Sequence, residues 1–208
     1  MAAEDAEALL RLGAGQLGLS LAPAQRRALL TYLAELDRWN APARLTAYRT
    51  ERARVLHLIL ESLLLLPVLP QDPSPLLDIG SGAGVPGLIL KIARPEWRIT
   101  LLEANRRRAN FLRHLIRTLG LSGVSLVQGR AELLAGEPGL RARFQAVTLR
   151  AVARLDRAVA LARPFVAPAG RIVIPLPKQG PPGPLVGVVR EVALTPALPL
   201  RRRFLILG

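Results

Sequence analysis

Cysteine is absent from this chain of 208 residues. Its absence excludes disulfide cross-links, a thiol nucleophile and zinc held by thiolates, and it is typical of a protein in a reducing compartment. Histidine is almost as scarce, with only His57 and His114. Because these are the side chains that most often bind transition metals, we expect no metal site.

Long apolar runs are also missing. The longest apolar stretch runs from Leu63 to Pro70 and contains two prolines, far short of the ~20 residues that a membrane-spanning helix needs. The first residues, which include Glu4, Asp5 and Glu7, lack the basic and apolar regions of a secretory signal. We therefore expect a cytoplasmic protein.

Lysine is rare among the basic residues. Lys91 and Lys178 are the only two, so 27 of the 29 basic residues are arginine, and the formal net charge is +14. A GC-rich coding bias would explain the choice of arginine, but not the excess over 15 acidic residues. Such an excess indicates a polyanionic partner, because neutralised phosphates release their condensed counterions. RNA, DNA and an anionic membrane all stay open on charge alone.

The hydrophobic pattern changes along the chain. Helical spacing of apolar residues in the first part gives way to short apolar runs that alternate with helical patterns. The expected helices cover residues 6–17, 24–39 and 50–66, and the expected strands cover 76–78, 98–102, 124–127, 145–149, 171–174, 185–194 and 204–207. This order predicts an α/β fold with a doubly wound, mostly parallel sheet.

A proline-rich run, Pro70 to Pro75, marks a boundary, because proline cannot continue a helix and restricts the residue before it. Residues 1–70 are expected to form an N-terminal helical segment and residues 71–208 the α/β core. The two parts are expected to make one compact unit.

The most informative segment is the glycine-rich loop after the first expected strand. A dinucleotide fingerprint that starts at Gly80 would need a glycine where the chain has Val85, and one that starts at Gly82 includes Pro86. The phosphate-binding loop pattern fails because no lysine directly follows Gly87. An acid two residues before Gly80, with glycines at every second position to Gly84, suits a ligand with a cationic or hydroxylated end and no pyrophosphate. S-adenosylmethionine fits this description.

A second feature supports a nucleoside ligand. Glu103 lies at the end of the next expected strand, where a carboxylate can accept hydrogen bonds from both hydroxyls of a ribose. NAD sites use the same arrangement, so Glu103 alone does not separate the two cofactors. The order of strand, loop, helix, strand and acid argues against an ordinary tight turn.

These residues belong to a longer set of motifs, and with them the chain resembles the RsmG (GidB) family, bacterial methyltransferases that modify N7 of one guanine in 16S ribosomal RNA. The matching pieces are Trp39-Asn40, Leu45-Thr46, Arg49, Glu61-Ser62 where the family has Asp-Ser, Asp78 to Gly87, Arg94-Pro95-Glu96, Arg106 to Leu112, Gly129 to Glu132 and Arg150 to Ala153.

The resemblance implies a class I methyltransferase fold with an N-terminal helical cap and S-adenosyl-L-methionine as cofactor. The expected cofactor contacts are Gly80, Gly82, Gly84, Val85, Glu103, Ala131, Glu132 and Arg150. The expected partner is 16S ribosomal RNA or the small ribosomal subunit, with no membrane or metal partner, and a monomer is expected. Two alternatives stay open: a methyltransferase of a small molecule or protein, and a non-catalytic RNA-binding protein.

Arg150 is the expected catalytic residue. Guanine N7 carries no proton, so its methylation needs alignment and no general base; we expect His57 and His114 to be structural. The planar guanidinium of Arg150 suits guanine O6 or a phosphate. The alternative is a structural ion pair with Glu132 or Asp78.

Other basic and aromatic residues are weaker candidates for RNA contacts. They are Arg106, Arg107, Arg108, Arg113 and Arg117, the run Arg201 to Arg203, Lys178, and Trp39 as a base-stacking residue. For the arginines a solvated surface is the alternative, and for Trp39 it is packing between helices.

Overall fold

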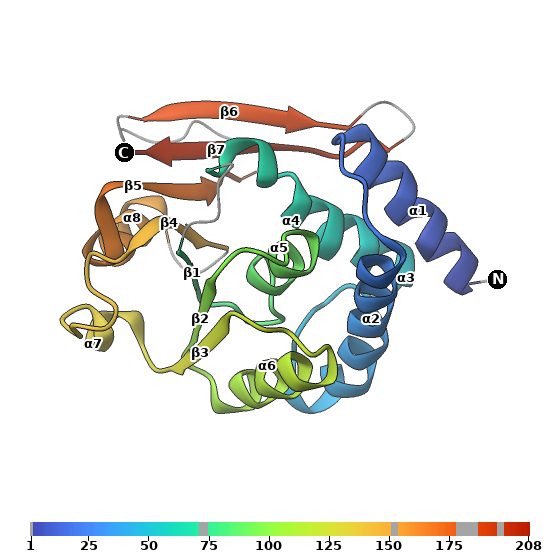
Figure 1. Cartoon of the computed structure of the whole chain (residues 1–208), viewed down its shortest axis with the longest axis horizontal. Helices are drawn as coiled ribbons and strands as arrows, with labels where there is room; N and C mark the ends of the chain where they lie inside the picture. Colours follow the sequence, from blue (N-terminus) through green and yellow to red (C-terminus); the bar gives the residue numbers. More distant parts are fainter. Residues whose placement is uncertain (1, 71–74, 151–153, 178–186, 195–197) are drawn as a thin grey trace.

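A computed structural model describes residues 2–70, 75–150, 154–177, 187–194 and 198–208 (Figure 1). Most of the proline-rich boundary, Lys178 and Ala151 to Ala153 lie outside these residues.

The centre of the molecule is a seven-stranded sheet with the strand order β3-β2-β1-β4-β5-β7-β6. The first five strands along the chain run parallel, β7 runs antiparallel to β5, and β6 runs antiparallel to β7. The strands are β1 Leu76–Ile79, β2 Ile99–Glu103, β3 Val124–Gln128, β4 Phe144–Leu149, β5 Val166–Pro175, β6 Val188–Ala193 and β7 Arg201–Leu207. The expected α/β fold with a mostly parallel, doubly wound sheet is therefore confirmed.

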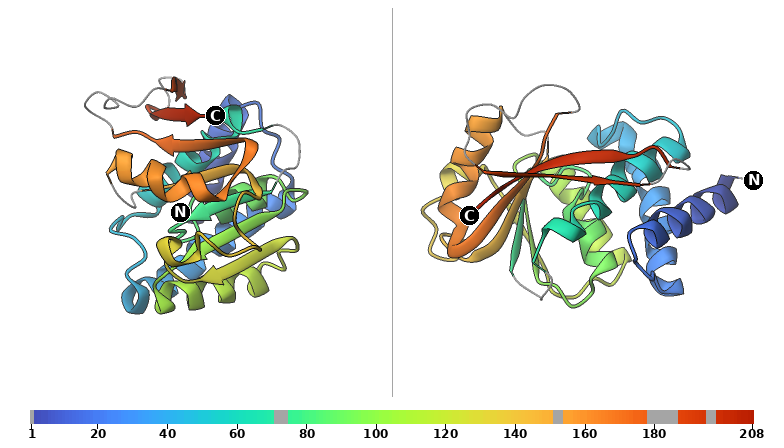
Figure 2. Two further views of the ribbon diagram at one scale, coloured as in Figure 1. Left: turned by 90° about the vertical axis from the view of Figure 1, so that its left-hand side faces the viewer. Right: turned by 90° about the horizontal axis from the view of Figure 1, so that it is seen from above.

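Among the described residues of the α/β core, helices cover both faces of the sheet (Figure 2). They are α5 Gly87–Ala93, α6 Arg106–Thr118, α7 Ala131–Leu134 and α8 Leu155–Ala162, each of which follows one of the strands β1 to β4. Apolar residues of α5 and α6 pack on one face, and those of α7 and α8 pack on the other. This placement follows from right-handed crossovers between parallel strands.

The N-terminal part is helical, as expected, but its last helix is interrupted. It contains α1 Ala2–Gln16, α2 Pro23–Ala43, α3 Glu51–Arg54, a π-helical stretch Val55–Leu60, α4 Glu61–Leu63 and a 3₁₀ turn Leu66–Val68. Thr50 caps α3 by accepting a hydrogen bond from the N–H of Ala53 at 3.2 Å. In the π-helical stretch the N–H of Glu61 donates to the carbonyl of Leu56, five residues earlier. Such stretches occur frequently at functional sites.

The helical segment shares one hydrophobic core with the α5 and α6 face of the sheet. Its buried residues Leu29 and Leu36 belong to the same cluster as Leu88 and Phe111 of the core helices. Gln25 adds polar links by donating through Nε2 to the carbonyls of Ile92 and Ala93, at the end of α5. The two parts are thus packed against each other by apolar and polar contacts.

Two strands begin clearly earlier than expected, β7 at Arg201 rather than Phe204 and β5 by a larger margin. β5 begins at Val166 rather than at Arg171, and its pairing with β4 shifts register between Phe144 and Ala146. The added residues include Pro168 and Gly170, which are poor strand formers, so the local pattern did not indicate a strand. Pairing with β4 extends the strand across them.

Within the described residues, the helices are too short or too polar to span a membrane. No group of three or more His, Asp or Glu side chains in these parts of the chain is placed to hold a metal ion.

Candidate active site

The glycine-rich loop connects β1 to α5 at the carboxyl edge of the sheet. Its backbone has positive φ at Gly80, Gly82 and Gly84, with values of 73°, 54° and 84°. At Gly82 a side chain would have space but would be strained by this φ; at Gly84 a Cβ would also lie 2.8 Å from Cδ1 of Leu88. Glycine is therefore required at both positions, for conformation at Gly82 and for conformation and packing at Gly84.

Asp78 supports the glycine loop through a buried hydrogen bond. Its side chain is fully buried, and Oδ2 accepts a hydrogen bond from the N–H of Gly87 at 3.0 Å. Oδ1 has no hydrogen-bond partner in the described part of the chain. Burial raises the pKa of Asp78 to about 7, although the N–H of Gly87 opposes this shift.

A cavity of about 820 Å³ lies in front of the loop. Of the eight expected cofactor contacts, seven line it: Gly80, Gly82, Val85, Glu103, Ala131, Glu132 and Arg150. The eighth, Gly84, is not among the described lining residues, and a Cβ there would point at Leu88 and Leu112. The tertiary structure thus places seven of the expected residues around one cavity, and Gly84 faces Leu88 and Leu112 instead.

Glu103 links β2 to the glycine loop. Its carboxylate is 4% exposed; Oε2 accepts a hydrogen bond from the N–H of Gly82 and Oε1 accepts one from the N–H of Asn105, both at 2.8 Å. Each oxygen can accept a second hydrogen bond. Glu103 therefore fixes the loop and still has acceptor capacity toward the cavity.

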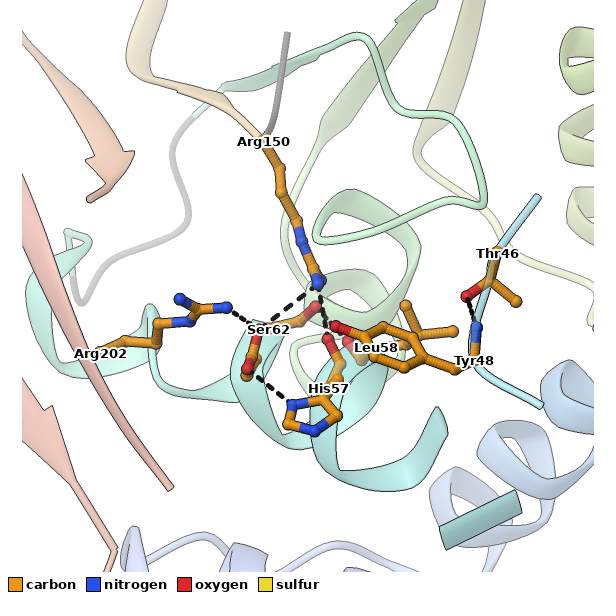
Figure 3. Close-up of polar contacts among 8 residues, drawn as sticks. Thr46, Tyr48, His57, Leu58, Ser62, Arg150 and Arg202 are labelled. Atoms are coloured by element: carbon orange, nitrogen blue, oxygen red, sulfur yellow. Dashed lines mark hydrogen bonds and ion pairs between the residues drawn. The ribbon is translucent and has the colours of Figure 1, made fainter. Parts of the chain in front are cut away.

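Arg150 follows β4 and lines both this cavity and a second one of about 450 Å³. Its Nη2 donates to the carbonyl of His57 at 2.7 Å and lies 3.4 Å from Oε2 of Glu61 (Figure 3). The expectation of an ion pair between Arg150 and Glu132 or Asp78 is wrong, because Arg150 pairs with Glu61. Glu132 instead pairs with Arg130 and Arg157, at 3.6 and 3.8 Å.

The second cavity is smaller, and both apolar and charged side chains line it. Its lining includes Tyr48, Glu61, Ser62, Pro86, Leu149, Arg150, Arg154, Ile174, Arg202 and Phe204. Tyr48, Arg150 and Arg154 line both cavities. The two spaces are therefore neighbours, and Arg150 stands at their junction.

Both histidines make structural contacts, as expected. Nδ1 of His57 lies 2.9 Å from Oε1 of Glu61, and its ring stacks on Tyr48 with centroids 4.8 Å apart. Nε2 of His114 lies 2.7 Å from Oε2 of Glu35 on α2. Neither histidine is among the described residues that line the two cavities.

Trp39 packs between α2 and α6. Its ring centroid lies 6.0 Å from that of Phe111 and 5.2 Å from that of His114. Of the two roles considered for Trp39, the structure supports packing between helices rather than stacking on a base.

Several arginines expected at an RNA surface are bonded within the protein. Arg107 and Arg108 of α6 donate to the carbonyls of Pro42 and Arg44, at 3.5 and 3.2 Å, and so join α6 to the end of α2. Arg202 donates to Glu61 at 2.7 Å.

Three further arginines line the larger cavity together with Arg108. Arg130 directly before α7, and Arg154 and Arg157 at the start of α8, have exposed side chains. Their position was not predictable from the sequence, because they do not form a run along the chain. The role of Glu61 was not predicted either, although the Glu61-Ser62 pair belongs to the motifs that match the family.

Comparison with known proteins agrees with this geometry. Residues 25–176 match the model of the GidB family, described as rRNA small subunit methyltransferase G. Proteins named ribosomal RNA small subunit methyltransferase G from Burkholderia pseudomallei (strain 668) and Burkholderia mallei (strain NCTC 10229) are each 42% identical over 171 residues, which is 81% of this chain and 74% of theirs.

Solved structures support the fold alone. A SAM-dependent methyltransferase from Aquifex aeolicus has a TM-score of 0.54 at 12% identity, covering 83% of this chain and 98% of its own. A predicted O-methyltransferase from Agrobacterium tumefaciens has a TM-score of 0.54 at 16% identity, covering 69% and 78%. From the family match, the 42% identity and the two cavities at the carboxyl edge of the sheet, we conclude that this chain belongs to the GidB family of small-subunit rRNA methyltransferases.

Proposed function

We propose that this protein transfers a methyl group from S-adenosylmethionine to N7 of a guanine in 16S ribosomal RNA. The observation that carries the proposal is the pair of neighbouring cavities, which share Arg150 and Tyr48. One cavity has the glycine loop and carboxylate of a nucleoside site, and the other has room for a base. The proposed place of action is the cytoplasm, where bacterial small subunits assemble.

The larger cavity fits the cofactor. Gly80 and Gly82 line it without a side chain, Val85 adds apolar surface, and Glu103 offers carboxylate oxygens for ribose hydroxyls. Ala131 and Glu132 would lie at the adenine, as the family resemblance implies. When bound, S-adenosylmethionine supplies a methyl group attached to a positively charged sulfur.

The smaller cavity is the proposed acceptor site. Leu149, Pro86 and Tyr48 offer apolar and aromatic surface to a base, and Arg150 can donate hydrogen bonds to guanine O6. Guanine N7 has a free lone pair and no proton, so the protein's task is to align the base and exclude water rather than to remove a proton. This agrees with the absence of His57 and His114 from the described cavity lining.

The positive charge around the larger cavity fits an RNA substrate. Arg130, Arg154 and Arg157 are exposed at its edge, and the whole chain carries a formal charge of +14. Arg154 also lines the smaller cavity, so these exposed guanidinium groups lie where they can bind the phosphates that flank a target nucleotide.

A labelling experiment tests the proposal. Purified protein is incubated with tritiated S-adenosylmethionine and with either 16S rRNA or small subunits from cells that lack this protein's activity, and the digested RNA is analysed for 7-methylguanosine. We expect label in one modified nucleotide, decreasing as salt rises. Absence of label in both substrates would contradict the proposal, and labelling of a small molecule or protein instead would assign a different substrate.

A further inference from the structure

Glu61 is a nearly buried carboxylate in the wall of the acceptor cavity. It is 5% exposed; Oε2 accepts a hydrogen bond from Nη2 of Arg202 at 2.7 Å and lies 3.4 Å from Nη2 of Arg150. Oε1 lies 2.9 Å from Nδ1 of His57. Figure 3 shows Arg150, Arg202 and His57 converging on this point from different segments. One carboxylate therefore joins the helical segment, the end of β4 and strand β7.

The charges of this cluster do not cancel. With His57 counted as neutral, two guanidinium groups face one carboxylate, which leaves a net charge of +1 beside the cavity. The side chains of Arg150 and Arg202 are only 21% and 16% exposed, so solvent screens them weakly. Without the carboxylate, the acceptor cavity would face two poorly screened cations.

This charge matters because the proposed reaction makes the base positive. Guanine N7 contributes its lone pair to the new bond with the methyl carbon, the broken carbon–sulfur bond leaves its electron pair on sulfur, and no proton moves. The methylated base then carries one positive charge. Cations around the acceptor cavity oppose this change, and a carboxylate favours it.

We propose that Glu61 is the countercharge for the methylated base: it holds Arg150 and Arg202 at the acceptor cavity and offsets their charge as the base becomes positive. The inference rests on the proposed function. Glu61 acts on Arg150 and Arg202 as a positioning residue, and on the base through its charge.

Nucleotide binding separates this role from a purely structural one. The full-length protein, saturated with S-adenosylhomocysteine, is titrated with guanosine 5′-monophosphate and with 7-methylguanosine 5′-monophosphate by calorimetry. We expect Glu61→Gln to lower the affinity for the methylated nucleotide about tenfold relative to the unmethylated one, because a nearby opposite charge shifts such equilibria by at least that factor. Arg202→Gln should shift the same ratio in the opposite direction, because it removes a cation.

Two further variants complete the design. Glu61→Asp keeps the charge and should return the ratio toward the wild-type value. Glu35→Gln is the matched control: Glu35 is also a buried carboxylate bonded to a histidine and an arginine, His114 and Arg38 at 2.7 Å each, but it lines neither cavity among the described residues. It should lower stability and leave the ratio unchanged.

Methyl transfer gives an independent readout. Glu61→Gln should lower kcat about tenfold while the KM for rRNA changes less than twofold, because the loss appears as charge develops. The inference is overturned if the nucleotide ratio and kcat are unchanged in both Glu61→Gln and Arg202→Gln, or if Glu35→Gln shifts the ratio equally. Failure of the proposed function has a different signature, since the wild-type protein would then methylate no rRNA at all.

Discussion

The hydroxyl of Tyr32 on α2 donates a hydrogen bond to the carbonyl of Ala83 in the glycine loop at 3.0 Å. Tyr32 is completely buried, and burial raises its pKa above the ordinary value for tyrosine, so the hydroxyl keeps its proton for this bond. A residue of the helical segment thus fixes the backbone between Gly82 and Gly84. The helical segment is therefore part of the support for the larger cavity, the proposed cofactor site.

Replacing Tyr32 tests this link. Tyr32→Phe leaves the Ala83 carbonyl without its buried partner, which should lower stability by about 1–3 kcal/mol. Part of that loss should appear as weaker binding of S-adenosylmethionine, on the order of fivefold for 1 kcal/mol, measured by calorimetry. Trp39→Phe is the control, since Trp39 packs between α2 and α6 and lines neither cavity among the described residues. It should lower stability only, and equal effects of both variants on affinity would contradict the link.

The glycine loop has its own test at Gly82. Gly82→Val places a β-branched side chain at φ 54° beside the cavity, and we expect S-adenosylmethionine binding to be lost. Gly15→Ala is the matched control, because a Cβ at Gly15 of α1 meets nothing within 4 Å. That change should leave binding intact and raise stability by up to about 1 kcal/mol. Unchanged affinity in Gly82→Val would show that the loop does not approach the ligand.

The raised pKa of Asp78 predicts that the stability of the protein depends on pH. Its pKa is raised to about 7 by burial, so the folded protein keeps this proton to about pH 7, whereas the unfolded chain releases it near pH 4. Between these values the folded state binds more protons, and the contribution of Asp78 to stability therefore falls as pH rises. Above pH 7 it stays constant.

The measurement compares wild-type protein with Asp78→Asn by urea unfolding from pH 4 to 8. The stability of the wild type relative to the variant should fall across this window by an amount on the order of 4 kcal/mol. Asparagine can still accept the hydrogen bond from the N–H of Gly87, so the comparison isolates the charge. A difference that is constant with pH would show that Asp78 ionises normally.

The arginines around the larger cavity predict a salt effect on RNA binding. Arg157→Gln should weaken binding to 16S rRNA and reduce the slope of log affinity against log salt by about one, the amount expected for one lost phosphate contact. Arg190→Gln on β6 removes the same charge from an exposed position that lines neither cavity among the described residues. Filter binding at several salt concentrations should separate the two variants, and equal slopes would place the RNA elsewhere.

Much of the fold was predictable because its signals are local. Alternating apolar runs and helical patterns located the strands β1 to β4 and the helices between them, and short connections in a parallel sheet bring the carboxyl ends of the strands to one edge. The glycine spacing after Asp78 and the acid at Glu103 therefore indicated a nucleoside cavity. The structure places seven of the eight expected residues around it.

The residues of the acceptor cavity could not be identified in the same way. Glu61 lies 89 positions from Arg150 and 141 from Arg202, and no periodicity connects them. Arg106 and Arg107 are exposed, as a basic run suggests, but the hydrogen bonds that join Arg107 and Arg108 to the end of α2 could not be read from the run.

By itself, the sequence determined the order of strands and helices and placed the glycine loop and Glu103 at the ends of two successive strands, because backbone freedom and hydrophobic periodicity act between near neighbours. Only the tertiary structure decided which arginines face ligands and which carboxylate they share. Charge pairs form wherever packing brings side chains within a few ångströms, and packing of the helical segment on the sheet is a property of the whole chain.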